Sequence, residues 1–77
     1  MPHFYFDAVL QGQAETDPVG VELADRAVAR QEAVRAAAEM AKDRHLGENA
    51  QDITLEVREE DEHVATVWLS LRVEEPS

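Results

Sequence analysis

The feature that most constrains this chain is its middle third, residues 24–46, which contains neither glycine nor proline. The segment is rich in Ala, Glu, Arg and Met, and its β-branched residues are only Val28 and Val34, so an α-helix is favoured. Asp25 is suited to cap the first turn, and Gly47 is suited to end the helix. The apolar side of the predicted helix consists mostly of alanines: Ala27, Ala29, Ala33, Val34, Ala36, Ala37, Ala38, Met40 and Ala41. Because these side chains are small, the sequence predicts an amphipathic helix that lies close against another element, most naturally a sheet.

Runs of alternating apolar and polar residues lie on both sides of this helix, and such alternation is typical of half-buried β-strands. One run covers residues 3–10, a second covers 53–58, and a longer one covers 63–73. The acidic residues 59–62 join the last two runs, which predicts an antiparallel hairpin.

A turn and a short return strand are expected between the first strand and the helix. Asp17-Pro18-Val19-Gly20 has the composition of a turn, and residues 19–23 are a candidate strand. The predicted fold class is α+β, a single antiparallel sheet (β-β-α-β-β) with one amphipathic helix packed on one face. The helix is expected to cover eight apolar side chains: Phe4, Phe6, Ile53, Leu55, Val57, Val67, Leu69 and Leu71.

Length and composition bound the class of protein. A chain of 77 residues corresponds to a single domain, residues 1–77, whose polar end, 73–77, is expected to fray. The net charge is −10, which argues against nucleic acid or an anionic membrane surface as a ligand. Without cysteine, disulfides, thiolate zinc sites and Cys nucleophiles are excluded. The sequence has no apolar run long enough to span a bilayer and no signal-peptide pattern, so we expect a cytoplasmic protein.

The sheet face opposite the helix is the most interesting candidate surface. Tyr5, Val64 and Trp68 would form an apolar, aromatic patch there, and such patches often mark interfaces. Arg58 and Arg72 complete this candidate interface. In the alternative interpretation, the long side chains of the two arginines lie over the Trp68 ring and shield it. A site for a flat small molecule is a further alternative for the same patch.

Arg30 falls inside the apolar arc of the predicted helix, where a charge needs a partner. Asp17, Glu22 and Asp7 are candidate partners if the first hairpin folds over that end of the helix. We favour a structural ion pair over an anion-binding role for this arginine.

Candidate catalytic and metal-binding residues are scarce. His3, His45 and His63 lie in different elements, and none has the spacing of a helical metal site. The hydroxyl residues have no accompanying glycine elbow, and 3 isolated glycines make no phosphate-binding loop. The sequence therefore predicts no enzyme activity, no bound metal and no cofactor.

Five segments carry a resemblance to known sequences: Phe4-Tyr5-Phe6-Asp7, Asp17-Pro18-Val19-Gly20-Val21-Glu22-Leu23, Asp25 followed by Ala29-Arg30-Gln31-Glu32-Ala33, Glu56-Val57-Arg58-Glu59-Glu60-Asp61, and the closing apolar strand. Over nearly its whole length the chain resembles a family of small bacterial proteins, frequent in alphaproteobacteria and known only as a domain of unknown function. Family members commonly have glycine after the acidic pair of the hairpin, a residue suited to a positive φ angle, and Glu62 stands at that place here. The resemblance supports the fold and implies no known activity, cofactor or catalytic residue.

Two better-known groups are similar in the order of their elements alone. HicB-type antitoxins imply an acidic inhibitor of a basic partner protein, and dodecins imply a small-molecule binder that stacks an aromatic side chain on flavin. Our leading hypothesis is a non-enzymatic module that acts through protein contacts, including self-association into a homo-oligomer. The dodecin-like and antitoxin-like functions are the alternatives. Exposed strand edges offer strand addition as a second mode of contact.

Overall fold

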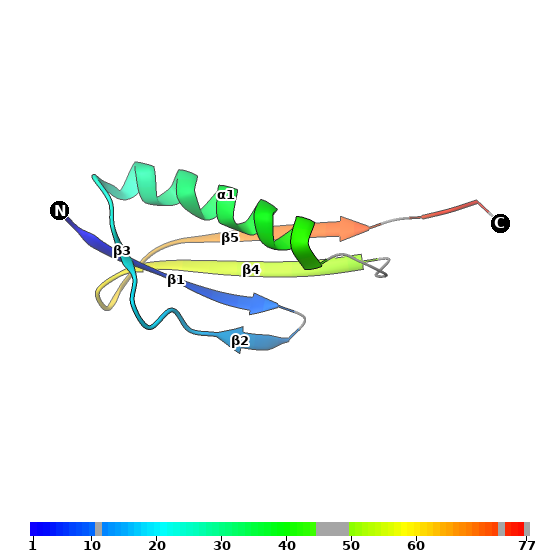
Figure 1. The fold of residues 1–77 in the computed structure, drawn as a ribbon, viewed down its shortest axis with the longest axis horizontal. Helices are drawn as coiled ribbons and strands as arrows, with labels where there is room; N and C mark the ends of the chain where they lie inside the picture. Colours follow the sequence, from blue (N-terminus) through cyan, green and yellow to red (C-terminus); the bar gives the residue numbers. More distant parts are fainter. Residues whose placement is uncertain (11, 45–49, 73, 77) are drawn as a thin grey trace.

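A computed structural model describes residues 1–10, 12–44, 50–72 and 74–76 of the chain. Within these residues there is one antiparallel sheet of five strands and one helix, so the predicted α+β class is confirmed. The helix lies along one face of the sheet, as Figure 1 shows. In chain order the elements are β1 (His3–Leu10), β2 (Gln13–Glu15), β3 (Val21–Glu22), α1 (Arg26–Arg44), β4 (Ala50–Glu59) and β5 (Glu62–Arg72).

The first strand is paired along both of its edges. The strand order is β2-β1-β4-β5, and β3 pairs with the edge of β1 that β2 also uses. The predicted return strand 19–23 is reduced to β3, and β2 was not predicted because three residues are too few to show a periodic pattern. Because β3 pairs with residues 3–4 and β2 with residues 8–10, residues 5–7 of β1 have no strand partner on that edge.

The core lies between α1 and the middle strands. Its largest fully buried side chains are Phe4, Ile53, Leu55 and Val57, which alternation had placed on the helix side. From the helix, Ala29, Ala33 and Ala37 are buried at intervals of four residues, so one narrow line of alanines touches the sheet. Others of the predicted set are only partly buried at the margin of the core: Phe6, Val67 and Leu69.

The helix is less amphipathic than the sequence suggested. Ala27 and Ala38 are exposed, and the Val34 side chain is 54% exposed, although all three belong to the predicted apolar arc. The arc is wider than the strip of helix that a sheet contacts, so part of it faces outward. Arg30 also lies on the exposed side.

Asp25 caps the helix as predicted. Its Oδ1 accepts a hydrogen bond from the backbone N–H of Val28 at 2.9 Å, and its backbone oxygen accepts one from Ala29 at 3.1 Å. The proposed stop at Gly47 lies outside the described residues. Nowhere in the described ranges is there a helix long and apolar enough to cross a membrane.

The predicted hairpin is present, with Glu60 and Asp61 in its turn. The positive φ, 54°, occurs at Glu60, whereas Glu62, where the family pattern has glycine, begins β5. The pairing of β4 with β5 shifts register near this turn, between Val57 and Arg58. Val57 pairs with Ala65, but Arg58 pairs with His63. This bulge leaves Val64 as an extra residue on β5 and changes the face that it occupies.

The start of the helix is tied to the same hairpin. The Arg26 guanidinium donates from Nε to Glu59 at 3.0 Å and from Nη2 to Glu62. Glu59 and Glu62 are cross-strand partners, so one arginine bridges both strands at the turn. The pKa of Arg26 is raised, first by its hydrogen bond to Glu62 and then by that to Glu59.

Candidate functional site

The sheet face opposite α1 contains two different halves. Strand register places the following alternate residues on this face: His3, Tyr5, Asp7, Val9, Asp52, Thr54, Glu56, Arg58, His63, Thr66, Trp68, Ser70 and Arg72. The half near the hairpin turn is a closed polar network, whereas the half toward the end of β5 contains an exposed aromatic side chain.

Arg58 is the centre of the polar half. Its Nε donates to Asp7 Oδ2 at 2.8 Å, and its Nη1 donates to the backbone oxygen of Glu60 at 2.9 Å. Its guanidinium carbon also lies 4.2 Å from the centre of the Tyr5 ring, which is directly opposite in register. The hydrogen bond to Asp7 is the main cause that raises the pKa of Arg58. Arg58 is thus engaged in holding the hairpin to β1.

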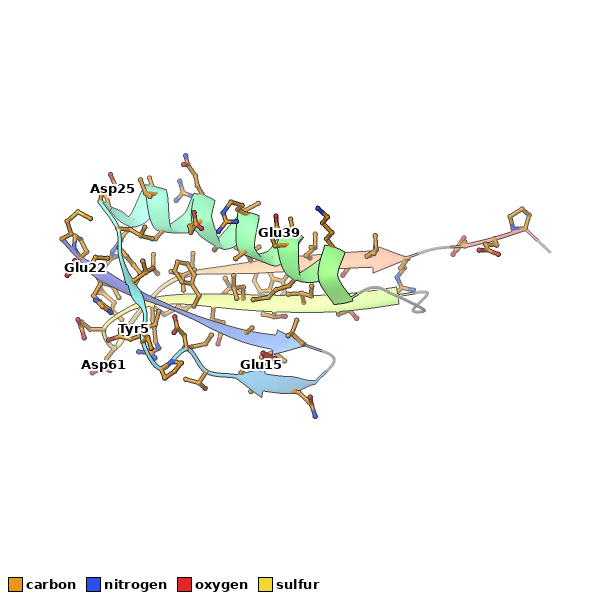
Figure 2. The ribbon with its side chains drawn as sticks, viewed as in Figure 1. Tyr5, Glu15, Glu22, Asp25, Glu39 and Asp61 are labelled. Carbon is orange, nitrogen blue, oxygen red and sulfur yellow. The ribbon has the colours of Figure 1, made fainter. Side chains whose placement is uncertain are left out.

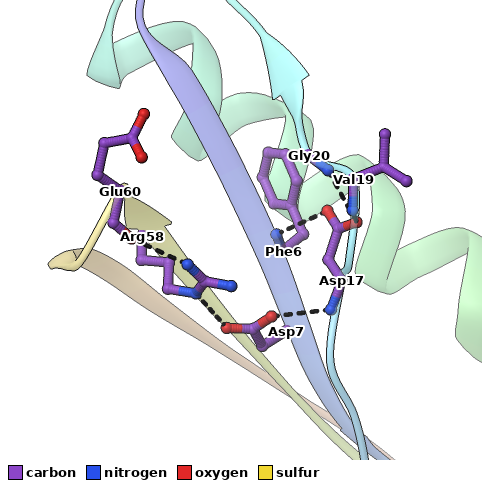
Figure 3. Close-up of polar contacts among 7 residues, drawn as sticks. All are labelled: Phe6, Asp7, Asp17, Val19, Gly20, Arg58 and Glu60. Atoms are coloured by element: carbon purple, nitrogen blue, oxygen red, sulfur yellow. Dashed lines mark hydrogen bonds and ion pairs between the residues drawn. The ribbon is translucent and has the colours of Figure 1, made fainter.

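Asp7 and Asp17 extend this network into the segment between β2 and β3 (Figure 3). Asp7 Oδ1 accepts from the backbone N–H of Asp17 at 2.9 Å. The Asp17 carboxylate in turn accepts from Phe6 at 3.2 Å, Val19 at 3.1 Å and Gly20 at 3.0 Å. Phe6 is in the part of β1 that lacks a strand partner, so the Asp17 side chain satisfies a donor that the sheet leaves open.

The pKa of Asp17 is lowered by this arrangement. Burial is the largest single influence and raises the pKa, but the hydrogen bonds from Gly20, Phe6 and Val19, with the positive charge of Arg58, outweigh it. The ionised carboxylate is therefore the form that the folded chain stabilises. Its role is to fasten the 16–20 segment to β1.

We expect Asp17→Ala to lower the free energy of unfolding by about 2 kcal/mol at pH 7, because several backbone donors lose a charged acceptor. Since the folded pKa is below the ordinary value of 3.8, this stabilisation is present above about pH 4 and is lost as the pH falls through the folded pKa. Urea unfolding of wild type and variant from pH 7 to pH 3 should show their difference shrinking. The same substitution at the exposed Glu75 is the control for removing one negative charge. A difference that is constant with pH would contradict the assignment.

His3 and Gly20 close the other side of this segment. His3 Nε2 lies 2.8 Å from the Val19 carbonyl oxygen, to which it donates, and its ring centre is 5.0 Å from that of Tyr5. Gly20 has φ of 72° and approaches β1 closely. The polar half is therefore occupied by contacts within the chain and offers no open site.

Trp68 dominates the second half. Its side chain is 74% exposed, and Thr54 is its partner across the strands. Arg58 is four positions beyond Thr54 in β4, which is about 13 Å along a strand. Tyr5 and Trp68 thus share a face, as expected, but do not form one patch. The exposure of Trp68 contradicts the alternative in which arginines shield it, and Arg58 lies against Tyr5 instead.

Of the other two residues of the predicted interface, Val64 leaves this face and Arg72 lies at its far end. Val64 is partly buried and packs against the core, because the bulge removes it from the face that holds Trp68. Arg72 is exposed at the end of β5, four residues beyond Trp68. Of the predicted set, only Tyr5 and Arg58 are in direct contact.

The predicted ion pair of Arg30 with Asp17 or Glu22 does not occur among the described residues. Arg30 points away from the sheet, Asp17 binds backbone donors, and Glu22 is exposed in β3 opposite His3. The cation of this region is Arg58, on a strand that sequence alone could not place beside β1. The Asp17-Pro18-Val19-Gly20 pattern could have indicated the role of Asp17, because Asp in a turn often accepts hydrogen bonds from backbone N–H groups two or three residues further along the chain.

Trp68 is surrounded by short side chains and by acids. Thr66 and Ser70 flank it along β5, and their partners across the strands are Glu56 and Asp52. Ser70 Oγ donates to Asp52 Oδ1 at 2.8 Å. Glu56 and Asp52 are both exposed, and both lie on β4 diagonally from Trp68.

Nothing in the described ranges brings three His, Asp or Glu side chains together in a metal-binding group. His3 hydrogen-bonds to the Val19 carbonyl and contacts the Tyr5 ring, His63 Nε2 hydrogen-bonds to Thr66 Oγ1 at 2.8 Å, and His45 lies outside the described residues. The absence of a cofactor and of catalysis stays a prediction.

Comparison with known proteins gives one match. Residues 3–70 match a family described as Domain of unknown function (DUF6894). Neither the curated proteins nor the solved structures contain a match to this chain. The match spans every strand and the helix except the end of β5.

Proposed function

The chain belongs to the DUF6894 family, a domain of unknown function, and from its surface we propose that it is a non-enzymatic protein-interaction module. The observation that carries this proposal is Trp68, a large aromatic side chain 74% exposed on a sheet face that α1 does not cover. Aromatic residues are enriched at the centres of protein interfaces, where their burial contributes strongly to affinity.

The shape of the surface favours a polypeptide over a small molecule. Pockets for small ligands bury most of the ligand, about 70–90% of its surface. Around Trp68 the neighbouring side chains on the same face are the short Thr54, Thr66 and Ser70, which build no wall beside the indole. A flat ring of the flavin type would rest on one side of Trp68 and stay open to water on the other.

In-cell photo-crosslinking tests the proposal and does not require the partner to be identified beforehand. The photoreactive residue benzoylphenylalanine is placed at position 68 and, as a matched control, at Gln31, which is exposed on the outer side of α1. We expect a discrete adduct of defined mass from position 68 and none of that mass from position 31. Identical adducts from both positions, or no adduct from position 68, would refute an interaction surface here.

A further inference from the structure

The two edges of the sheet are protected to very different degrees. One edge is formed by the short strands β2 and β3, which have three and two residues, with Pro18 between them. The other is β5, eleven residues long, which pairs with β4 alone among the described strands. From His63 to Leu71 it contains no charged residue and no proline. Proteins normally guard long edges with such residues, because an open edge pairs with another strand.

On the helix side, the margin of β5 is apolar and incompletely covered. Val67 and Leu69 are only partly buried, and Leu71 is 36% exposed. A strand added beside β5 would place every second side chain against these residues. Apolar side chains at those positions would complete the burial that α1 leaves unfinished.

On the face opposite α1, the same strand carries Trp68, and acidic residues lie on the neighbouring strand β4. Glu56 and Asp52 lie diagonally from Trp68 across β4, at about 7–8 Å between Cα atoms. Lys or Arg on an added strand would lie beside the indole ring, which attracts cations, and within reach of the carboxylates. Long side chains can cross the short Thr66 and Ser70 to reach them.

Together these features define the occupant of the edge. We propose that β5 binds an extended segment of a basic partner protein, in which Lys or Arg alternates with apolar residues, as an added strand of the sheet. This inference rests on the proposed function and specifies the chemistry of the partner. The chain's net charge of −10 would steer such a segment toward it.

A second copy of this chain fits the edge less well. It would bring a further charge of −10, and acids such as Glu15, Glu39 and Asp61 are spread over the sheet edge, the helix and the hairpin turn (Figure 2). If β5 paired with β5 of another copy, the side chains offered on this face would be Thr66, Trp68 and Ser70 with a single cation, Arg72. A second copy would thus bring one arginine for the two carboxylates of Glu56 and Asp52, whereas an alternating basic segment brings several cations.

Peptide binding tests the proposal on the whole chain. The probe is a labelled nine-residue peptide that alternates Arg and Val, followed by fluorescence anisotropy. Two controls are a peptide of the same composition with its arginines in one block and a peptide that alternates Glu and Val. We expect the alternating basic peptide to bind at least about tenfold more tightly than the block peptide, because only alternation satisfies both faces. Equal affinity of these two peptides would show simple charge attraction and overturn the proposal.

Changes to the backbone and to the surface make the test specific. N-methylation of alternate peptide residues should abolish binding in one of the two possible patterns and spare the other, since only one set of N–H groups faces β5. Glu56→Gln with Asp52→Asn should weaken binding more than Glu39→Gln with Glu75→Gln, which removes the same charge elsewhere. Loss in both methylation patterns or in neither, or equal weakening by the two double variants, would overturn strand addition at this site.

The experiments distinguish a failure of this inference from a failure of the proposed function. If position 68 crosslinks a partner but the alternating peptide shows no preference, the interaction surface stands and the basic strand is wrong. Light scattering behind a sizing column, at two protein concentrations, identifies a second copy. A dimer that Trp68→Ala dissociates would also overturn the basic-strand proposal, because the edge would then hold another copy of this chain.

Discussion

Gly20→Ala is expected to remove most of the stability of the fold, with a loss of about 3 kcal/mol in the free energy of unfolding. The φ angle of Gly20 is 72°, where an L side chain alone costs about 1 kcal/mol. A Cβ at this position would also lie 2.7 Å from the Phe4 carbonyl oxygen and 2.7 Å from His3 Nε2. Carbon–oxygen contacts normally begin at about 3.3 Å. The Phe4 oxygen has little freedom to move, since Phe4 is paired with strands on both sides.

Gly12→Ala is the matched control. Gly12 has a similar φ of 82°, but a Cβ there would meet no atom within 4 Å. We expect a loss of about 1 kcal/mol, or roughly 4–8 °C in melting temperature, against at least about 12 °C for Gly20→Ala. Thermal unfolding followed by circular dichroism measures both. Equal losses would mean that the backbone angle alone matters and that the close approach of Gly20 to β1 is not rigid.

This contrast between two glycines illustrates what the sequence could and could not predict. Turn composition placed a bend at residues 17–20, because proline and glycine restrict the backbone locally. The closeness of Gly20 to Phe4 depends on β3 pairing with the start of β1, a contact between residues far apart in the chain. The helix and the hairpin were predicted for the same reason as the bend, since their periodicity and caps are local.

The candidate site was harder to predict, because it depends on register. Alternation correctly assigned Tyr5 and Trp68 to the face opposite α1, but only the pairing of β1 with β4 shows that Arg58 lies opposite Tyr5. Apolar residues are adjacent at Val64-Ala65, where the bulge lies, but also at Val67-Trp68-Leu69, where there is none, so the sequence alone does not locate the bulge. One extra residue at a strand end reverses the face of a side chain, which is why Val64 was assigned wrongly.

The two halves of the uncovered face have complementary roles in this interpretation. Around Arg58 the charges are paired and the backbone donors satisfied, so the hairpin and the 16–20 segment are fixed to β1. Around Trp68 the side chains are exposed and the adjoining edge of β5 is unpaired within the described residues. Because this part of the sheet is already held in place, less conformational entropy is lost when a partner binds at the neighbouring edge of β5.

Leu55→Ala is the second large effect that we expect, and it tests the frame itself. Leu55 is 0% exposed in β4, between Ala8 of β1 and Val67 of β5. Removing a fully buried leucine side chain costs about 2–5 kcal/mol through lost transfer energy and the cavity left behind. A domain of this size has about 3–5 kcal/mol of net stability, so the variant should be largely unfolded without denaturant.

The control for Leu55→Ala is the same substitution at Leu71, which is 36% exposed near the end of β5. It should cost less than about 1 kcal/mol, because much of that side chain is already in water. Leu55→Val, which leaves a smaller cavity, should give a folded protein with a measurable loss and so keeps the comparison possible. Urea unfolding at pH 7 ranks the three variants. If Leu71→Ala proved as damaging as Leu55→Ala, the core would extend to the edge of β5, and that edge would not be open for a partner strand.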